Sequence, residues 1–370
     1  MLIISLLGPI VSSLLCLYLP RQLGHYAGNL MVTLFITSTI SSLLLTYYTL
    51  QNNVVIILTL LRFSSVLGIT WEISIDHYSC TLLSIVLLVS TCVNSYSLYY
   101  MSNDSTQIRF IGLMSTFTSY MLLLILSNNI VTLFLNWELI GVLSYLLIHY
   151  WSDRIAAVLS ALKTMLINKL GDYLITIALI LIVTQISTSE FTLLNNLYNV
   201  TSTGSDMHYY SSIIFYTLLF GACAKSAQIG LHLWLADAMN GPTPVSSLLH
   251  AATLVVSGPI LLYKILMLTN YHVTTLQFIG ITSSLLGSLL ALAQTDSKAI
   301  IAYSTMSQFG LIISVSSIYS IASSQLHIIN HAAFKACLFM SIGLVIHALH
   351  DAQDYRTYGS MAYILPIKII

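Results

Sequence analysis

The feature that most constrains this chain is a series of apolar runs, each about 20 residues long, which recur along its 370 residues. A helix of that length crosses the hydrocarbon core of a bilayer. In lipid the backbone must satisfy its own hydrogen bonds, so only helices and closed barrels span membranes. A barrel would need short alternating segments, whereas these runs are continuous in Leu, Ile, Ser and Thr. The sequence therefore predicts an all-α polytopic membrane protein.

Composition excludes several other classes of protein. Charged residues make up only 6% of the chain, against about 25% in soluble domains. The net charge is zero and no basic tract occurs, so we expect lipids and no nucleic acid among its partners. The five cysteines include no Cys-x-x-Cys pair, which argues against an iron–sulfur cluster or a structural zinc site in this chain.

Eleven runs qualify as candidate spans. They cover residues 2–19, 29–50, 78–100, 110–127, 130–150, 158–184, 211–235, 244–268, 274–293, 299–320 and 324–348. Between the second and third, the region 54–78 contains a segment that alternates with a period of two, so we expect a short extramembrane strand there.

The few basic residues predict an orientation. Five of them follow odd-numbered spans, namely Arg21, Arg109, Arg154, Lys298 and Arg356, whereas Arg62 follows an even-numbered one. By the positive-inside rule the odd-numbered loops face the matrix or cytoplasm. The first run carries no basic targeting segment, so we expect insertion where the protein is made, in a bacterium or an organelle that translates its own gene.

Ionisable residues inside spans are costly and commonly mark ion or proton paths. Glu138 lies between apolar neighbours in the fifth span and must be paired or protonated, unless it is a helix-end residue wetted by headgroups. Lys169 and Asp172 are three residues apart in the sixth span, so a pair that merely neutralises itself is equally plausible.

The seventh span carries Lys225 among Ala and Ser residues, and Glu138 is the obvious carboxylate to pair with it. Gly230 and the Gly-Pro-Thr-Pro stop at 241–244 follow, which indicates either a broken helix at membrane depth or an ordinary helix end. The eighth span carries His250, a side chain that titrates near neutrality, and then a Gly-Pro pair at 258–259 that should kink it. A lone buried histidine is nevertheless more often a satisfied core residue.

The eleventh span places His327, His331 and Lys335 four residues apart, on a stripe that covers roughly 80° of the helix. Two histidines at this spacing could bind a metal. No carboxylate or cysteine lies nearby to complete a site, and the lysine would repel a cation. A proton path is therefore the favoured interpretation of the stripe.

Several motifs together resemble the antiporter-like proton-channel family of respiratory complex I. In order along the chain they are Trp-Glu-Leu-Ile-Gly-Val (137–142), Asn-Lys-Leu-Gly-Asp (168–172), Lys-Ser-Ala-Gln-Ile-Gly-Leu-His (225–232), the block 234–253, Ile-Ala-Tyr-Ser-Thr-Met-Ser-Gln (301–308) and Asn-His-Ala-Ala-Phe-Lys-Ala (330–336). The resemblance extends over essentially the whole chain and is strongest from about 130 to 355.

This resemblance implies two inverted five-helix repeats, each with one interrupted helix. It divides the chain into N-terminal helices (1–107), a first repeat with its half-channel (108–270) and the first part of a second repeat (271–370). It implies a proton path through Glu138, Lys225, His250 and Lys335, supported by the residues Lys169, Asp172, His327, His331 and Asp296.

Two departures from the family pattern matter. The usual proline of its Trp-Leu-Pro-Asp segment is Ala236 here, and the chain stops at Ile370, before the family's second channel lysine and its lateral helix. We therefore expect the second repeat to be incomplete and a separate chain to supply the missing helices.

The resemblance implies a proton-translocating membrane-arm subunit in the mitochondrial inner membrane, bound to other membrane-arm subunits. It would carry no cofactor of its own, while FMN, iron–sulfur clusters and ubiquinone would lie in other subunits. In the expected mechanism, movement of Glu138 away from Lys225 releases the lysine proton through His250 to Lys335. The alternatives are a subunit of a multisubunit sodium/proton antiporter and a membrane redox protein with His327 and His331 as haem or metal ligands.

Overall fold

The computed structural model describes residues 1–19, 24, 26–52, 55–64, 69–186, 188–194, 205–265, 273–317, 321–349 and 351–359. Arg21, most of the connection between 187 and 204 and the C-terminal residues from 360 lie outside the described part of the chain. The long helices are α1 (Leu2–Tyr18), α3 (Tyr26–Asn52), α4 (His77–Tyr100), α5 (Gln107–Leu126), α6 (Ile130–Ile148), α7 (Ile155–Ile186), α9 (Ser205–Lys225), α14 (Val273–Ala293), α15 (Ser297–Ser316) and α16 (Ile321–Ala348). The short elements are β1 (Ile56–Ser64), β2 (Ile69–Ile75), α10 (Leu233–Asp237), η1 (Ala238–Asn240), α11 (Thr243–Ala251), α12 (Ser257–Lys264) and η2 (Tyr355–Thr357).

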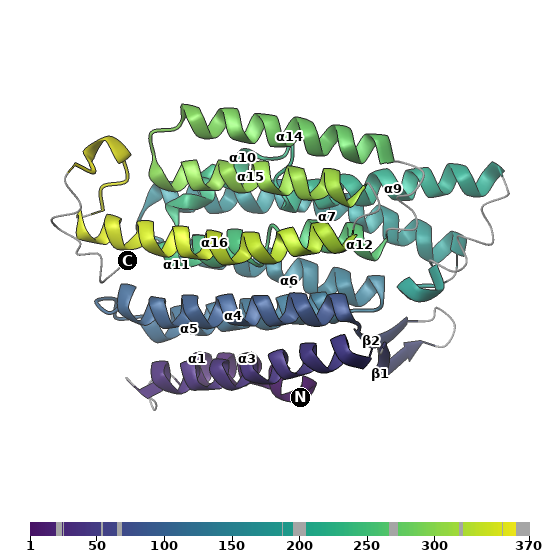
Figure 1. Ribbon diagram of the computed structural model, residues 1–370, viewed down its shortest axis with the longest axis horizontal. Helices are drawn as coiled ribbons and strands as arrows, with labels where there is room; N and C mark the ends of the chain where they lie inside the picture. The colour runs from purple at the N-terminus through teal and green to yellow at the C-terminus, as the bar shows by residue number, and fades with distance from the viewer. Residues whose placement is uncertain are drawn as a thin grey trace.

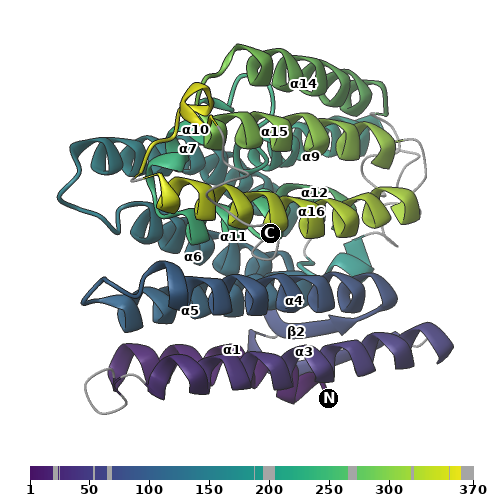
Figure 2. The same ribbon diagram turned by 60° about the vertical axis from the view of Figure 1, so that its left-hand side comes forward.

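The long helices run nearly parallel to one another and are stacked from α1 and α3 on one side to α14 on the other (Figures 1 and 2). The α4–α5 pair lies next to α1 and α3, and α16 lies between α4 and α15. The hairpin of β1 and β2 projects from one end of the bundle, and η2 lies at the opposite end (Figure 1). The predicted helical membrane architecture is confirmed.

Hydroxyl groups account for much of the polarity within these apolar helices. Ser12 Oγ donates to the Pro9 carbonyl at 2.7 Å, and Ser38 Oγ donates to the Phe35 carbonyl at 2.7 Å. The same bond to the carbonyl three residues earlier recurs along most of the spans. Because the helix satisfies its own hydroxyls, Ser and Thr can be frequent in spans without a partner from another helix.

By length and composition, eight described helices can cross a membrane: α3, α4, α5, α6, α7, α14, α15 and α16. The helix α1 is apolar but has only 17 residues. The predicted span 211–235 covers most of α9 and the start of α10, and the predicted span 244–268 covers α12 and all but the first residue of α11. The count of eleven spans stays a prediction.

The strand expected at 54–78 is β2, and it pairs with a second strand that its alternating pattern had not indicated. β1 and β2 are antiparallel, with Ile56 opposite Ile75 and Thr59 opposite Glu72. The strand β2 turns Ile73 and Ile75 into the core. β1 is instead a continuous apolar run, so its pattern did not distinguish it from a buried helix.

The helix α9 ends at Lys225 with a Schellman-type turn. The Gln228 amide donates to the Cys223 carbonyl at 2.9 Å. Ala227, inside the turn that this bond closes, has φ = 52°. Glycine is usual at such a left-handed position. Gly230, with φ = 85°, turns the chain again before α10 begins at Leu233. The local backbone thus ends the helix in the interior even though residue 236 is alanine.

The interruption in the next predicted span lies before the Gly-Pro pair. The helix α11 ends at Ala251 and α12 begins at Ser257, which places Gly258 and Pro259 in the first turn of α12. Proline is tolerated there because the first turn of a helix has no intrahelical acceptor for its missing N–H. The kink expected at 258–259 is therefore displaced to residues 252–256.

Four of the basic residues used to predict the orientation belong to elements that meet at one end of the bundle. Arg109, Arg154 and Lys298 lie at or beside the N-terminal ends of α5, α7 and α15, and Arg356 lies in η2 (Figure 1). Arg154 also pairs with Asp351 at 3.8 Å. Arg62 belongs to β1, at the opposite end, but its side chain is outside the described part of the chain.

Replacement of Ala227 by glycine tests the turn that ends α9. Ala227→Gly relieves the left-handed strain, about 1–2 kcal/mol. It also removes a buried methyl group and raises the entropy of the unfolded chain, which offset this gain. The stability should therefore change by less than about 0.5 kcal/mol. The matched change Ala236→Gly, in the right-handed α10, should cost about 1 kcal/mol. Thermal unfolding midpoints of the purified assembly would compare them, and equal losses would contradict the turn described here.

Candidate functional site

Lys225 lies in the last turn of α9 and is completely buried. Its ammonium group donates a hydrogen bond to the Trp137 carbonyl on α6 and lies 4.2 Å from the centre of the Trp137 ring. Gly141, one turn further along α6, also lies next to the ammonium, whose nitrogen would be in ordinary contact, at 3.8 Å, with a Cβ there. Since a buried cation needs acceptors, this surface of α6 serves as a binding site for it.

Trp137 also holds a buried carboxylate. Its indole nitrogen donates to Asp172 Oδ1 on α7 at 2.7 Å, and both side chains are buried. Asp172 acts electrostatically on Lys225, as does Glu138. Trp137 therefore joins α6, α7 and α9 around one cation and one carboxylate.

Glu138 has a different partner from the one that the sequence suggested. Its carboxylate pairs with Lys169 on α7, and the two side chains are 26% and 34% exposed. Trp137 and Glu138 are consecutive in α6 and so project about 100° apart, which directs the tryptophan toward α9 and the glutamate toward Lys169. The expected direct pairs, Glu138 with Lys225 and Lys169 with Asp172, are replaced by this arrangement.

His250 lies one helix away, completely buried in α11. Its ring is stacked on Trp234 at 6.1 Å between centroids and lies 5.9 Å from Phe339. Trp234 in turn donates to the Ala224 carbonyl at 2.9 Å, next to Lys225. Neither ring nitrogen of His250 has a hydrogen-bond partner among the described residues. Trp234 thus links the end of α9 to a buried imidazole that is free to accept or donate.

Lys335 of α16 is the next buried cation. Its ammonium donates to Ser304 Oγ at 2.6 Å and to the Ile301 carbonyl at 3.3 Å, both on α15. It acts electrostatically on His250 and on His331. His331 is buried between the rings of Phe309 and Phe334, at 4.8 and 5.2 Å. The two histidines and Lys335 thus form one electrostatically connected group.

The supporting residue His327 lies outside the buried group of Lys335, His250 and His331. His327 Nε2 is 2.9 Å from Gln308 Oε1, half-buried between α16 and α15. His327 is bonded to an amide, and His331 is surrounded by aromatic rings. Neither contact provides a third ligand for a metal bound by the two histidines. No group of three ligating residues occurs in the described ranges.

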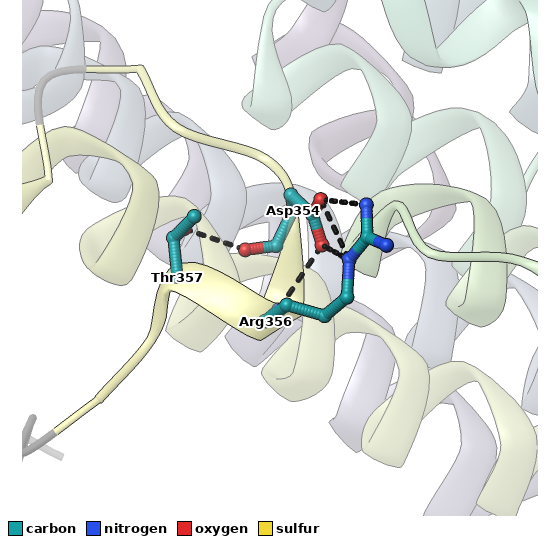
Figure 3. A network of polar contacts seen from close by, with 3 residues as sticks. All are labelled: Asp354, Arg356 and Thr357. Carbon is teal, nitrogen blue, oxygen red and sulfur yellow. Dashed lines mark hydrogen bonds and ion pairs between the residues drawn. The ribbon is translucent and has the colours of Figure 1, made fainter.

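Asp296 is exposed at the start of α15 and forms a backbone bridge with Asp354. Figure 3 shows the neighbouring contacts, in which Arg356 donates from Nε and Nη2 to the Asp354 carboxylate at 3.0 and 2.5 Å. These bonds hold the pKa of Asp354 below its usual value. Asp296 therefore belongs to the folded connection at the bundle end and does not join the buried group.

Trp137 and Ser304 lie within the sequence motifs but carry no charge, so the pattern of ionisable residues does not include them. A buried tryptophan needs an acceptor for its indole N–H, so its position beside Glu138 was the available signal. Lys163 and Asp237, which form an ion pair between α7 and α10, are separated by 74 residues, and no local pattern connects them.

Comparison with known proteins places this arrangement in a family. Residues 127–370 match the family described as NADH:quinone oxidoreductase/Mrp antiporter, transmembrane part. The chain belongs to this family. Residues 62–111 also match the N-terminal region of chain 5 of NADH-ubiquinone oxidoreductase (complex I).

Curated relatives agree with the family assignment. The chain is 37% identical to NADH-ubiquinone oxidoreductase chain 5 of Aspergillus niger, over 99% of this chain and 56% of that protein. It is 38% identical to the Podospora anserina protein of the same name, over 99% of this chain and 56% of the relative. The Marchantia polymorpha protein is 40% identical over 82% of this chain and 47% of its own length. The chain thus spans about half the length of these relatives.

Solved structures show the same fold. A chain of the Mrp complex from Dietzia sp. superposes with a TM-score of 0.80 at 27% identity, over 93% of this chain and 37% of that chain. A chain of an archaeal membrane-bound sulfane sulfur reductase superposes with a TM-score of 0.84 at 19% identity, over 95% of this chain and 72% of that chain. The second likeness bears on the fold alone.

The change Trp137→Phe tests the role of the indole as a donor. It leaves the buried Asp172 without this donor, which should cost about 1–3 kcal/mol of stability, while the carbonyl contact to Lys225 is kept. Trp151→Phe is the matched control, because its indole has no hydrogen bond among the described residues. Thermal unfolding in detergent measures both, and equal effects would contradict the assigned bond.

Proposed function

We propose that this chain is a proton-translocating membrane-arm subunit of respiratory complex I. The single observation that carries the proposal is the buried succession of Lys225 on α9, His250 on α11 and Lys335 on α16, in which Trp234 links the first two. Membership of the family and the chain 5 relatives support it. In this function NADH oxidation and ubiquinone reduction occur in other subunits, which hold FMN and iron–sulfur clusters, and the chain itself binds no cofactor.

Glu138 acts on Lys225 through Lys169 in this mechanism. While Lys169 holds the glutamate, the Lys225 ammonium keeps the Trp137 carbonyl as its hydrogen-bond acceptor. When Lys169 moves away, Glu138 becomes available to attract Lys225 and favours its charged form. Exchange of one carboxylate between two lysines would therefore gate the release of a proton toward His250 and Lys335.

The interruptions of the predicted spans seven and eight support the same mechanism. The end of α9 at Lys225 and the gap between α11 and α12 beside His250 interrupt both predicted spans in the interior, an arrangement typical of transporters. We propose that these are the broken helix and the half-channel of the first repeat, residues 108–270, with the second repeat beginning at 271. The supporting residues of the path are then Lys169, Asp172, His327 and His331.

The ion pair of Glu138 and Lys169 also bears on partners. Both side chains remain partly exposed near the middle of spanning helices, where contact with lipid would be costly. We propose that a neighbouring membrane-arm subunit covers this surface in the mitochondrial inner membrane. The N-terminal ends of α5, α7 and α15, which carry the basic residues, would face the matrix. The expectation that a separate chain completes the second repeat rests on the resemblance alone.

The change Lys225→Met tests the proposed function. It keeps side-chain length but removes the titrating group, so NADH-driven proton transport by membrane vesicles should fall at least about tenfold. Lys163→Met is the matched control, since Lys163 is a lysine of the spanning helix α7 that is ion-paired with Asp237 and 44% exposed, outside the buried group. Normal transport by a normally assembled Lys225→Met variant would refute the proposal.

A double-mutant cycle of Glu138→Gln and Lys169→Met tests the gating. If the two residues act as one switch, the double variant should lose no more proton transport than the worse single variant. Transport rates of the three assemblies, normalised to assembled protein, would provide the comparison. Effects that multiply would show that Glu138 does not act through Lys169.

The rival function, a subunit of a multisubunit sodium/proton antiporter, is favoured by the likeness to the Mrp complex. The two functions differ in energy source. Sodium-dependent proton transport by the purified assembly without NADH would support the antiporter, whereas transport that requires NADH oxidation would support complex I.

A further inference from the structure

A second set of buried polar groups lies where α4, α11 and α16 meet, and the proposed path does not use it. Among the described residues, neither the Tyr96 hydroxyl nor the Thr243 hydroxyl has a hydrogen-bond partner of regular geometry. Thr243 is completely buried. Unpaired buried polar atoms are costly and rare in folded proteins, so a cluster of them calls for a ligand or a function.

Gly343 of α16 brings two of these groups together. A Cβ added at this position would collide with the Tyr96 hydroxyl oxygen and would lie 2.9 Å from Thr243 Oγ1. Both hydroxyls therefore face the same bare stretch of α16 backbone. The Tyr100 hydroxyl is also within interaction range of Thr243. The two hydroxyls can therefore approach this backbone only because residue 343 is glycine.

From Thr243 the polar groups continue along α11 to the proposed proton path. Thr243, Ser247 and His250 are four and three residues apart, so they share one face of the helix. This face lies against α16, since Ser247 donates to the Ala336 carbonyl at 3.5 Å and His250 lies 5.9 Å from the Phe339 ring. This polar face of α11 therefore ends beside the His250 imidazole, on which Lys335 acts electrostatically.

In the other direction the polar groups reach the surface. The ring of Tyr96 is 5.7 Å from that of Tyr100, which is 5.8 Å from His347. His347 is exposed near the end of α16, at the end of the bundle where η2 lies (Figure 1). A row of packed rings thereby leads from the exposed His347 to the hydroxyl groups of Tyr96 and Thr243 beside Gly343.

We propose that the line His347, Tyr100, Tyr96, Thr243 and Ser247 is a proton-uptake branch that supplies His250 and Lys335 from this end of the bundle. The inference rests on the proposed function. Water molecules bridge the hydroxyl groups. Each hydroxyl oxygen accepts a proton from the outer side and releases its own proton to the inner side, so it is neutral before and after the transfer. The His250 imidazole receives the proton.

The Tyr96 and Tyr100 hydroxyls both lie within interaction range of Thr243, but neither the Tyr96 nor the Thr243 hydroxyl forms a hydrogen bond of regular geometry among the described residues. Their donors and acceptors therefore stay available to passing water, as a relay needs. The same geometry predicts opposite effects of one substitution on the two properties. Removal of the unpartnered Thr243 hydroxyl should leave stability unchanged or raise it, while proton transport should fall.

The test compares variants of the complete assembly in membrane vesicles, with NADH-driven proton transport and thermal midpoint as readouts. Tyr96→Phe and Thr243→Val should each lower transport at least about tenfold, since a positioned proton-transfer group is worth about 10²–10⁴-fold in rate. Thr243→Ser should recover transport relative to Thr243→Val. Tyr99→Phe is the matched control, because Tyr99 is 64% exposed on the same helix.

The outcomes separate this inference from the proposed function. Normal transport by Tyr96→Phe and Thr243→Val, with transport lost in Lys225→Met, would overturn the branch and leave the function standing. Normal transport by Lys225→Met would overturn both. A fall in transport that matches a fall in thermal midpoint for Thr243→Val would also overturn the branch, because it would show a structural role. Where Tyr96→Phe fails to assemble, the Thr243 pair decides.

Discussion

The contact between the Lys225 ammonium and α6 is the interaction on which the rest of the site depends. A cation cannot stay charged inside the bundle without acceptors, because the cost of its desolvation would be prohibitive. The Trp137 carbonyl and ring provide that environment, and the indole of the same residue binds Asp172 on α7. One tryptophan thereby fixes how three helices approach one another.

The interrupted helices provide the second requirement, a route away from the lysine. The helix α9 ends at Lys225 because the chain adopts a left-handed turn at Ala227, and Trp234 donates to the Ala224 carbonyl, which also accepts from the Ala227 amide in this turn. The same Trp234 ring lies on His250. The groups that satisfy the helix end therefore also determine where the next titratable side chain lies, so that stability and the proposed transport share the same contacts.

Candidate residues could be recognised from the sequence because charge in an apolar span is rare and conspicuous. Lys225, His250 and Lys335 stand out in this way, and all three are buried inside the bundle. Their partners were less predictable. Glu138 and Lys225 are 87 residues apart, and only the rotation of α6 decides that Trp137, not Glu138, faces the lysine. Asp296 also met the criterion of a charge beside a span, but it lies at an exposed helix start.

The sequence alone determined that the chain is helical and spans a membrane, since long apolar runs satisfy their backbones in lipid in only that way. It also determined which ionisable side chains lie within spans, where their desolvation is costly and indicates a function. The tertiary structure decided which of them meet, because pairing across helices depends on rotation and register that no local pattern records. It also revealed the unpaired hydroxyls at Gly343, which a sequence cannot indicate, since Ser, Thr and Tyr in a span are ordinarily satisfied by their own helix or lie at its ends.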